Sequence, residues 1–73
     1  NIRNFILSDN YIWVNLISRV RLMNLESGES WYYNENDGIL GSNIYEVGNN
    51  QEWVWFLSDK GISIYNWRKY HGN

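Results

Sequence analysis

The sequence repeats itself with an offset of 42 residues. Trp13 and Trp55 are 42 positions apart, and their neighbours match in apolar character at the same offset. We therefore expect two similar units, residues 1–42 and 43–73, the second cut short at its C-terminal loop. The segments that coincide are Asn1-Ile2 with Asn43-Ile44, Phe5 with Val47, Tyr11-Ile12-Trp13-Val14 with Trp53-Val54-Trp55-Phe56, Val20 with Ile62, Leu22 with Ile64, and Asn24 with Asn66.

Each unit is predicted to consist of short strands. Ile62 and Ile64 alternate with Gly61, Ser63 and Tyr65, which is the period of a strand, and no window keeps the spacing of three and four residues that marks an amphipathic helix. Turn-forming residues separate several of these segments. The predicted strands cover residues 2–7, 11–16, 19–25 and 30–34 in the first unit, and 43–47, 53–58, 61–67 and 68–71 in the second.

A repeat of about 40 to 45 residues built from four short strands is typical of a β-propeller blade. We predict an all-β chain of two four-stranded antiparallel β-propeller blades, part of a closed propeller. Closure would come from homo-oligomerisation, as a trimer or tetramer, or from the remaining blades of a longer parent chain. Large rings would fill the wedge between blades. The residues expected in this interblade core are Trp13, Trp53, Trp55 and Phe56.

Composition argues against several classes of partner. The chain has no cysteine, one histidine and a net charge of -2. Disulfides and thiolate metal sites are thereby excluded, and we predict no metal site and no cofactor. The charge provides no basic surface for nucleic acid or anionic lipid, and no apolar run approaches the roughly 20 residues of a membrane helix. Neither nucleic acid nor a membrane is an expected partner.

Catalytic candidates are weak. General acid and base catalysis needs carboxyl groups in a cleft, whereas the acidic pairs of this chain lie at or near predicted turns, where solvent surrounds them. His71 has no neighbouring Ser, Cys or Asp pattern of a nucleophilic triad. We predict no catalytic residue and no enzymatic activity in this chain. The acidic pairs are Glu26/Glu29, Glu35/Asp37 and Glu46/Glu52.

A ligand site, if present, is expected at one end of the blades. Successive antiparallel strands bring the loops after the second and fourth strands of a blade to the same end. Asp59 and Lys60 are expected first to form a turn, and ligand contact is the second interpretation. The candidate ligand-binding residues are Arg19, Asp37, Asp59, Lys60 and His71. Aromatic residues on outer strands that could stack on a ligand are Trp31, Tyr32, Tyr33, Trp67 and Tyr70.

The order of short motifs is similar to that of a known family. The motifs are Asp37-Gly38-Ile39, Ser42-Asn43-Ile44, Val54-Trp55-Phe56 and Gly61-Ile62-Ser63-Ile64-Tyr65-Asn66, with Asn1-Ile2, Ile12-Trp13-Val14 and Val20-Arg21-Leu22-Met23-Asn24 in the first copy. This order resembles the two-component regulator propeller repeat over almost the whole chain. The family continues its tryptophan motif with Gly-Thr, where this chain has Asn15-Leu16 and Leu57-Ser58, and Arg19 replaces the expected glycine.

The resemblance implies a function and a location. It implies a non-enzymatic module for ligand recognition or assembly, from the periplasmic or extracellular sensing region of a bacterial regulator. A glycan or a peptide would be the ligand. The alternative is a blade pair from a propeller enzyme, such as a glycoside-active protein, whose catalytic residues would lie outside this chain. Hydrolysis by the parent protein would separate the two.

Overall fold

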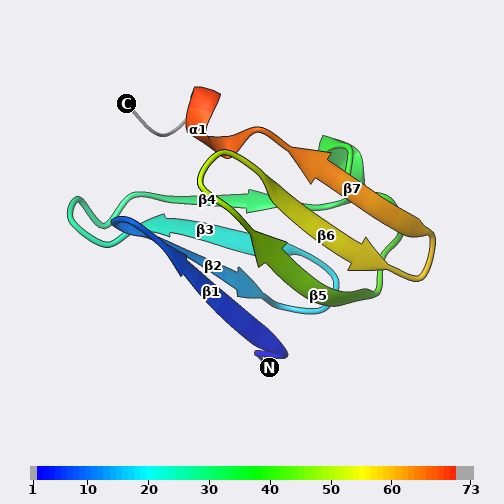
Figure 1. The fold of residues 1–73 in the computed structure, drawn as a ribbon. Coiled ribbons are helices and arrows are strands. Elements are labelled where there is room, and N and C mark those ends of the chain that lie inside the picture. The colour runs from blue at the N-terminus through cyan, green and yellow to red at the C-terminus, as the bar shows by residue number, and fades with distance from the viewer. Residues whose placement is uncertain (1, 71–73) are drawn as a thin grey trace.

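The computed structural model describes residues 2–70, which form two antiparallel sheets (Figure 1). Sheet A contains β1 (Asn4–Ser8), β2 (Tyr11–Asn15), β3 (Val20–Asn24) and β4 (Ser30–Tyr33), in that order. Sheet B contains β5 (Ile44–Asn49), β6 (Val54–Ser58) and β7 (Gly61–Tyr65). A 3-10 turn, η1 (Glu35–Asp37), follows β4, and a short helix, α1 (Trp67–Tyr70), follows β7. The prediction of a β protein with antiparallel strands is confirmed.

The prediction of a fourth strand in the second unit, over residues 68–71, is wrong. Residues 67–70 form α1, and residue 71 lies outside the described part. The Asn66 side chain accepts a hydrogen bond from the backbone N–H of Lys69 at 3.1 Å, in the manner of a helix N-cap. Trp67 is buried and its Nε1 donates to the carbonyl of Asn50 at 3.3 Å. These contacts favour a turn of helix, so sheet B has three strands.

The loop between β2 and β3 turns without glycine. Asn15 accepts the N–H of Ile17 on its side-chain oxygen at 2.8 Å, and the N–H of Leu16 donates to the carbonyl of Arg19 at 2.9 Å. Ile17 has φ of 77°, which is strained for a β-branched residue. Its carbonyl accepts the N–H of Ile44 at 2.7 Å. This loop therefore ties sheet A to the start of sheet B.

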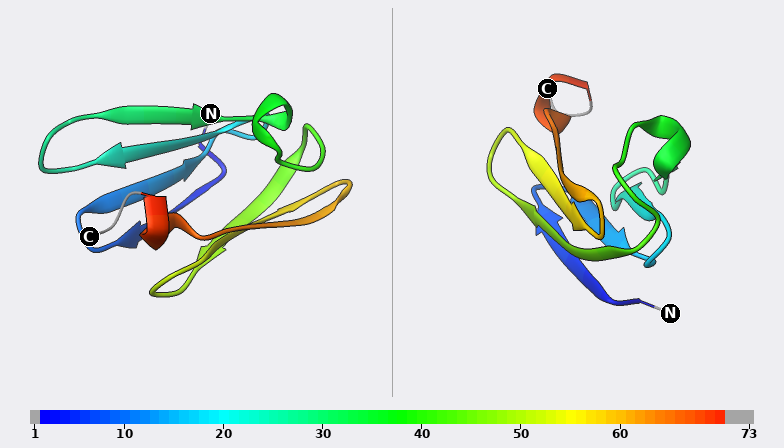
Figure 2. Two further views of the ribbon diagram at one scale, coloured as in Figure 1. Left: turned by 90° about the horizontal axis from the view of Figure 1, so that it is seen from above. Right: turned by 90° about the vertical axis from the view of Figure 1, so that its right-hand side faces the viewer.

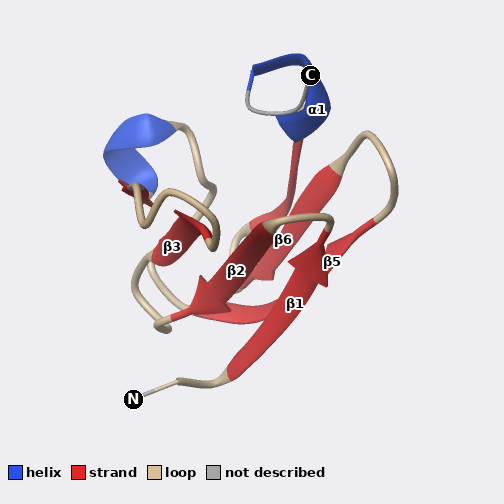
Figure 3. Ribbon diagram, turned by 90° about the vertical axis from the view of Figure 1, so that its left-hand side faces the viewer, coloured by secondary structure: helices blue, strands red, loops and turns tan. Residues whose placement is uncertain are grey.

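The two sheets face each other, and β5 runs beside β1 and β2 (Figures 2 and 3). Trp13 lies fully buried between the sheets, with ring centroids 6.0 Å from Phe56 and 6.4 Å from Tyr65. Burial of large rings on this scale is the main stabilising term for so short a chain. The core consists of Trp13, Val20, Leu22, Ile39, Ile44, Val47, Val54, Phe56 and Trp67.

Polar side chains join the sheets where β1 and β5 approach. The Asn15 side chain is fully buried, and its Nδ2 donates to the carbonyl of Ile44 at 2.9 Å and to Oδ1 of Asn4 at 3.0 Å. Asn4 in turn donates to the carbonyl of Val47 at 3.3 Å. Buried polar groups need such partners, so these bonds fix the position of one sheet on the other.

Residues that match across the repeat lie on opposite faces of their sheets. Trp13 is on the inner face of sheet A, whereas Trp55 is on the outer face of sheet B and is 37% exposed. The expectation that both are buried is wrong within a single chain, where Phe56 is also buried and Trp53 is also exposed. The interblade core that includes a further blade stays a prediction. The other inner residues of sheet A with outer counterparts in sheet B are Val20 with Ile62 and Leu22 with Ile64. The outer residues of sheet A with inner counterparts in sheet B are Phe5 with Val47, Ile12 with Val54, and Val14 with Phe56.

Strand alternation explains the exposure of Trp55. Val54, Phe56 and Ser58 of β6 point to sheet A, so the residues between them point away. The Trp55 indole covers Gly48 on the neighbouring strand, and a Cβ at that position would collide with its Nε1. Glycine at this site therefore lets the ring lie against the sheet.

Replacing Trp13 by alanine should lower the free energy of unfolding by about 3 to 5 kcal/mol, because the ring fills the space between the sheets. Urea denaturation followed by circular dichroism measures this, and complete loss of the cooperative transition also fits. Trp53→Ala is the control, since its side chain is 40% exposed, and should cost less than about 1 kcal/mol. Equal losses in the two variants would contradict the core described here.

Candidate functional site

The segment between β4 and β5 and the turn between β6 and β7 lie at the same end of the sheets, as predicted for these two kinds of loop. Asp59, in the turn between β6 and β7, accepts the N–H of Asn43 on Oδ1 at 3.2 Å and donates its own N–H to the carbonyl of Asn43 at 3.1 Å. The backbone N–H of Leu40 donates to Oγ of Ser63 at 2.8 Å, and the Ser58 hydroxyl donates to the carbonyl of Leu40. The segment between the sheets is thus held against sheet B.

The five candidate ligand residues are not brought into one site. The Arg19 guanidinium packs over the ring of Tyr32 at 4.4 Å and borders a separate shallow hollow. Asp59 serves the turn described above, and Lys60 is exposed beside it. His71 lies outside the described residues. Of the four candidates among residues 2–70, Asp37 alone lines the crevice between the two sheets.

That crevice lies between the two sheets, with Tyr33 of β4 on one side and residues of β7 on the other. Its volume is about 260 Å³. The sheets lie close together at β1 and β5, whereas β4 and β7, at the other edge, meet through the rings of Tyr33 and Tyr65. The lining residues are Tyr33, Asp37, Gly38, Ile39, Phe56, Ser63, Ile64 and Tyr65.

Two tyrosines form the aromatic walls of the crevice. The ring centroids of Tyr33 and Tyr65 are 5.9 Å apart, and the Tyr65 ring also stacks on Tyr70 at 5.5 Å. Burial raises the pKa of Tyr33 far above its usual value of 10, and the neighbouring phenol of Tyr65 adds to this shift. Burial also raises the pKa of Tyr65. Both rings therefore carry neutral hydroxyl groups at ordinary pH.

Local sequence places Asp37 at the mouth of this crevice. Asn34 precedes η1 and accepts the N–H of Asn36 on Oδ1 at 2.8 Å, while Oδ2 of Asp37 accepts the N–H of Asn34 at 3.0 Å. This reciprocal capping fixes the carboxylate. Gly38 follows with φ of 102°, a conformation that favours glycine. The negative charge of Asp37 is one of the causes that raise the pKa of Tyr33.

Sequence reasoning missed Tyr65, Phe56 and Ser63 as residues of a cavity. Tyr33 was expected to be available for stacking, but Tyr65 was assigned only to a strand. The alternation in β7 places Ser63 and Tyr65 on its inner face, which could have been inferred once sheet A was known to lie there. No local sequence pattern shows that the two sheets face each other, so these residues could not be assigned to one cavity.

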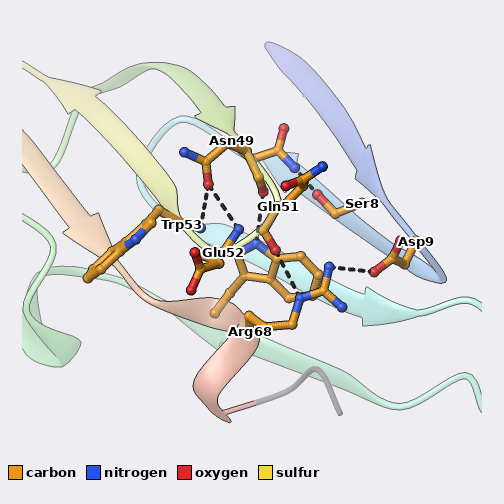
Figure 4. Close-up of polar contacts among 9 residues, drawn as sticks. Ser8, Asp9, Asn49, Gln51, Glu52, Trp53 and Arg68 are labelled. Atoms are coloured by element: carbon orange, nitrogen blue, oxygen red, sulfur yellow. Dashed lines mark hydrogen bonds and ion pairs between the residues drawn. The ribbon is translucent and has the colours of Figure 1, made fainter.

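A polar cluster at the opposite end joins α1 to both sheets (Figure 4). Arg68 forms an ion pair with Asp9 at 2.8 Å and donates from Nε to the carbonyl of Gln51 at 2.9 Å. Asn49 donates to the hydroxyl of Ser8 across the sheets. Asp9 and Arg68 are partly exposed, so this ion pair adds little stability by itself. The cluster mainly sets where α1 lies.

The acidic pairs considered for catalysis are exposed, and five of their six members lie outside strands, as predicted. Glu46 is the exception, on the outer face of β5. Across residues 2–70, no group of three or more His, Asp or Glu side chains is arranged to hold a metal ion. Within the same residues, no helix has the length and apolar character needed to span a membrane.

Raising the pH should weaken folding through Tyr33. Its folded pKa lies above that of the unfolded chain, about 10, so the contribution is complete below pH 10 and is lost as the pH rises further. The free energy of unfolding, measured in urea between about pH 8 and pH 11.5, should therefore fall less steeply in Tyr33→Phe than in the wild type. Parallel curves for the two proteins would contradict the assignment.

The sequence was compared with protein-family models and with curated proteins, and the chain with solved structures. None of the three comparisons gives a match. Function must therefore be inferred from the crevice and from the faces of the two sheets.

Proposed function

We propose that the chain is a pair of β-propeller blades, residues 1–42 and 43–73, that acts as a non-enzymatic recognition module. The opposite facing of repeat-matched residues supports the blade assignment. Propeller blades are related by rotation, so the front of one blade packs on the back of the next. Two sheets related by a two-fold axis would instead bury matched residues together, whereas Trp13 is buried and Trp55 is exposed.

The crevice between the sheets is the observation that carries the recognition role. Binding sites for small molecules are concave, mostly apolar, and contain a few fixed polar groups. Here Phe56 and two tyrosine rings supply apolar surface, and the phenol hydroxyls, Ser63 and Asp37 supply polar groups. The capping of η1 holds the carboxylate in place before any ligand arrives, which lowers the entropic cost of binding.

A neutral sugar fits this chemistry best among the ligand classes considered. The apolar face of a pyranose ring can pack on the tyrosine rings, while its hydroxyl groups donate to the Asp37 carboxylate and to the phenol oxygens. Asp37 is the one charged residue lining the crevice among those described, so an acidic sugar would be repelled. The resemblance to sensor propellers points to the same ligand class and to a periplasmic or extracellular location.

The proposal assigns no catalytic step to this chain. Hydrolysis of a glycoside uses two carboxyl groups on either side of the scissile bond. Among residues 2–70 a single carboxylate, that of Asp37, lines the crevice. Release of shorter sugars during incubation with the chain would favour the propeller-enzyme alternative.

Titration of the 15N-labelled chain with neutral trisaccharides (cellotriose, maltotriose, xylotriose) tests the proposal by NMR. We expect the largest shifts at the amides of Gly38, Ile39 and Ser63, and roughly tenfold weaker binding by Asp37→Asn, since a hydrogen bond to a carboxylate contributes about 1.5 to 3 kcal/mol.

Glu35→Gln is the matched control, because it removes the same charge from η1 outside the crevice. It should bind like the wild type, and trigalacturonate should bind more weakly than the neutral sugars. Shifts confined to the other end of the sheets, around Asp9 and Gln51, or no shifts at millimolar sugar, would refute the proposal.

A further inference from the structure

The outer face of sheet B is apolar and exposed. On β6 and β7 every side chain that points away from sheet A is large and apolar, and Ile64 is 66% exposed. Exposed patches of this kind on soluble proteins usually mark an interaction surface. The outer face of sheet B is formed by Trp55, Leu57, Ile62 and Ile64, with Tyr45, Glu46 and Trp53 around them.

The outer face of sheet A is apolar along β1 and β2. Phe5 and Leu7 are 57% and 60% exposed, and they lie opposite Val14 and Ile12 of the adjacent strand. No layer among residues 2–70 therefore covers this face either. Its polar part is on β3 and β4, where Arg21 reaches Ser30 at 3.0 Å.

The repeat relates these two free faces to the two faces already packed together. Trp55 of the outer face of sheet B corresponds to Trp13, which packs on Phe56. Phe56 in turn corresponds to Val14, on the outer face of sheet A. The outer face of sheet B thus resembles the inner face of sheet A. The outer face of sheet A likewise resembles the inner face of sheet B.

We propose that the outer face of sheet B docks on the outer face of sheet A of a second copy of this chain. The contact would repeat, between chains, the sheet packing seen within one chain, and it rests on the blade architecture proposed above but not on sugar binding. Charge agrees with this pairing. Glu46 borders the first face, whereas Arg19 and Arg21 lie near the Tyr32 ring on the second.

The contact joins two different faces, so it propagates until a ring closes. Propellers close with about 4 to 8 blades. With two sheets in each chain, a trimer would contain six and a tetramer eight, and these are the closed forms we expect.

Two single substitutions test the direction of docking. Ile64→Glu places a charge on the outer face of sheet B, and Phe5→Glu does so on the outer face of sheet A. Each should abolish assembly in light scattering and leave a species of 8.8 kDa. Each variant keeps one intact face, so an equimolar mixture should form a heterodimer of twice that mass, which cannot grow further.

Leu25→Glu is the control, because Leu25 is 52% exposed in the turn between β3 and β4, away from both faces, and should assemble like the wild type.

Other outcomes would overturn the proposal. A wild-type chain that stays monomeric at about 0.5 mM has no such interface. If Phe5→Glu alone still dimerised, sheet B would be docking on itself, and a mixture without heterodimer would exclude head-to-tail docking. A variant that is unfolded alone supports the proposal if mixing restores its circular dichroism spectrum, and opposes it if mixing does not. Sugar titration of Phe5→Glu reports on the crevice separately, because Phe5 lies outside the crevice, whereas Ile64 is one of its lining residues.

Discussion

The packing of sheet A on sheet B around Trp13 is the contact on which the rest of this structure depends. A four-stranded and a three-stranded sheet of this size each have one face to bury, and neither can do so alone. Trp13 supplies the largest buried surface and contacts rings from both sheets, while Asn15 anchors the start of β5 with its amide. The indole Nε1 of Trp13 is buried without a hydrogen-bond partner among the described residues, at a cost of about 1 to 3 kcal/mol that ring burial must exceed.

The same packing generates both proposed surfaces. Because the sheets meet closely at β1 and β5 and diverge towards β4 and β7, a crevice remains between Tyr33 and Tyr65. Because the inner faces of the two sheets pack on each other, the apolar outer face of each sheet stays exposed. The proposed recognition in the crevice and the proposed docking of a second copy are therefore separate consequences of one arrangement, and Ile64 borders both surfaces.

The sequence predicted seven strands to within a few residues, because alternation and turn residues act locally. It failed at residues 68–71, where the side chain of Asn66 and the burial of Trp67 favour a helical turn. It also treated Trp13 and Trp55 as alike, since an offset of 42 residues equates them. Which of two equivalent faces is covered depends on how the two sheets pack on each other, and no local sequence pattern contains that information. Asp37 was a ligand candidate because of its place in a loop. Tyr65 was not, because its place in the crevice depends on the packing of the two sheets.

Ring contacts within one chain test most directly whether the Trp13 face of sheet A packs on the Phe56 face of sheet B. Nuclear Overhauser effects, measured on dilute Ile64→Glu so that no second copy contributes, should connect the indole protons of Trp13 with ring protons of Phe56 and Tyr65. The indole of Trp55 should show contacts to Gly48 and to the residue at position 64 on its own sheet, and none to sheet A. Contacts from Trp55 to sheet A, with none from Trp13 to sheet B, would contradict the account.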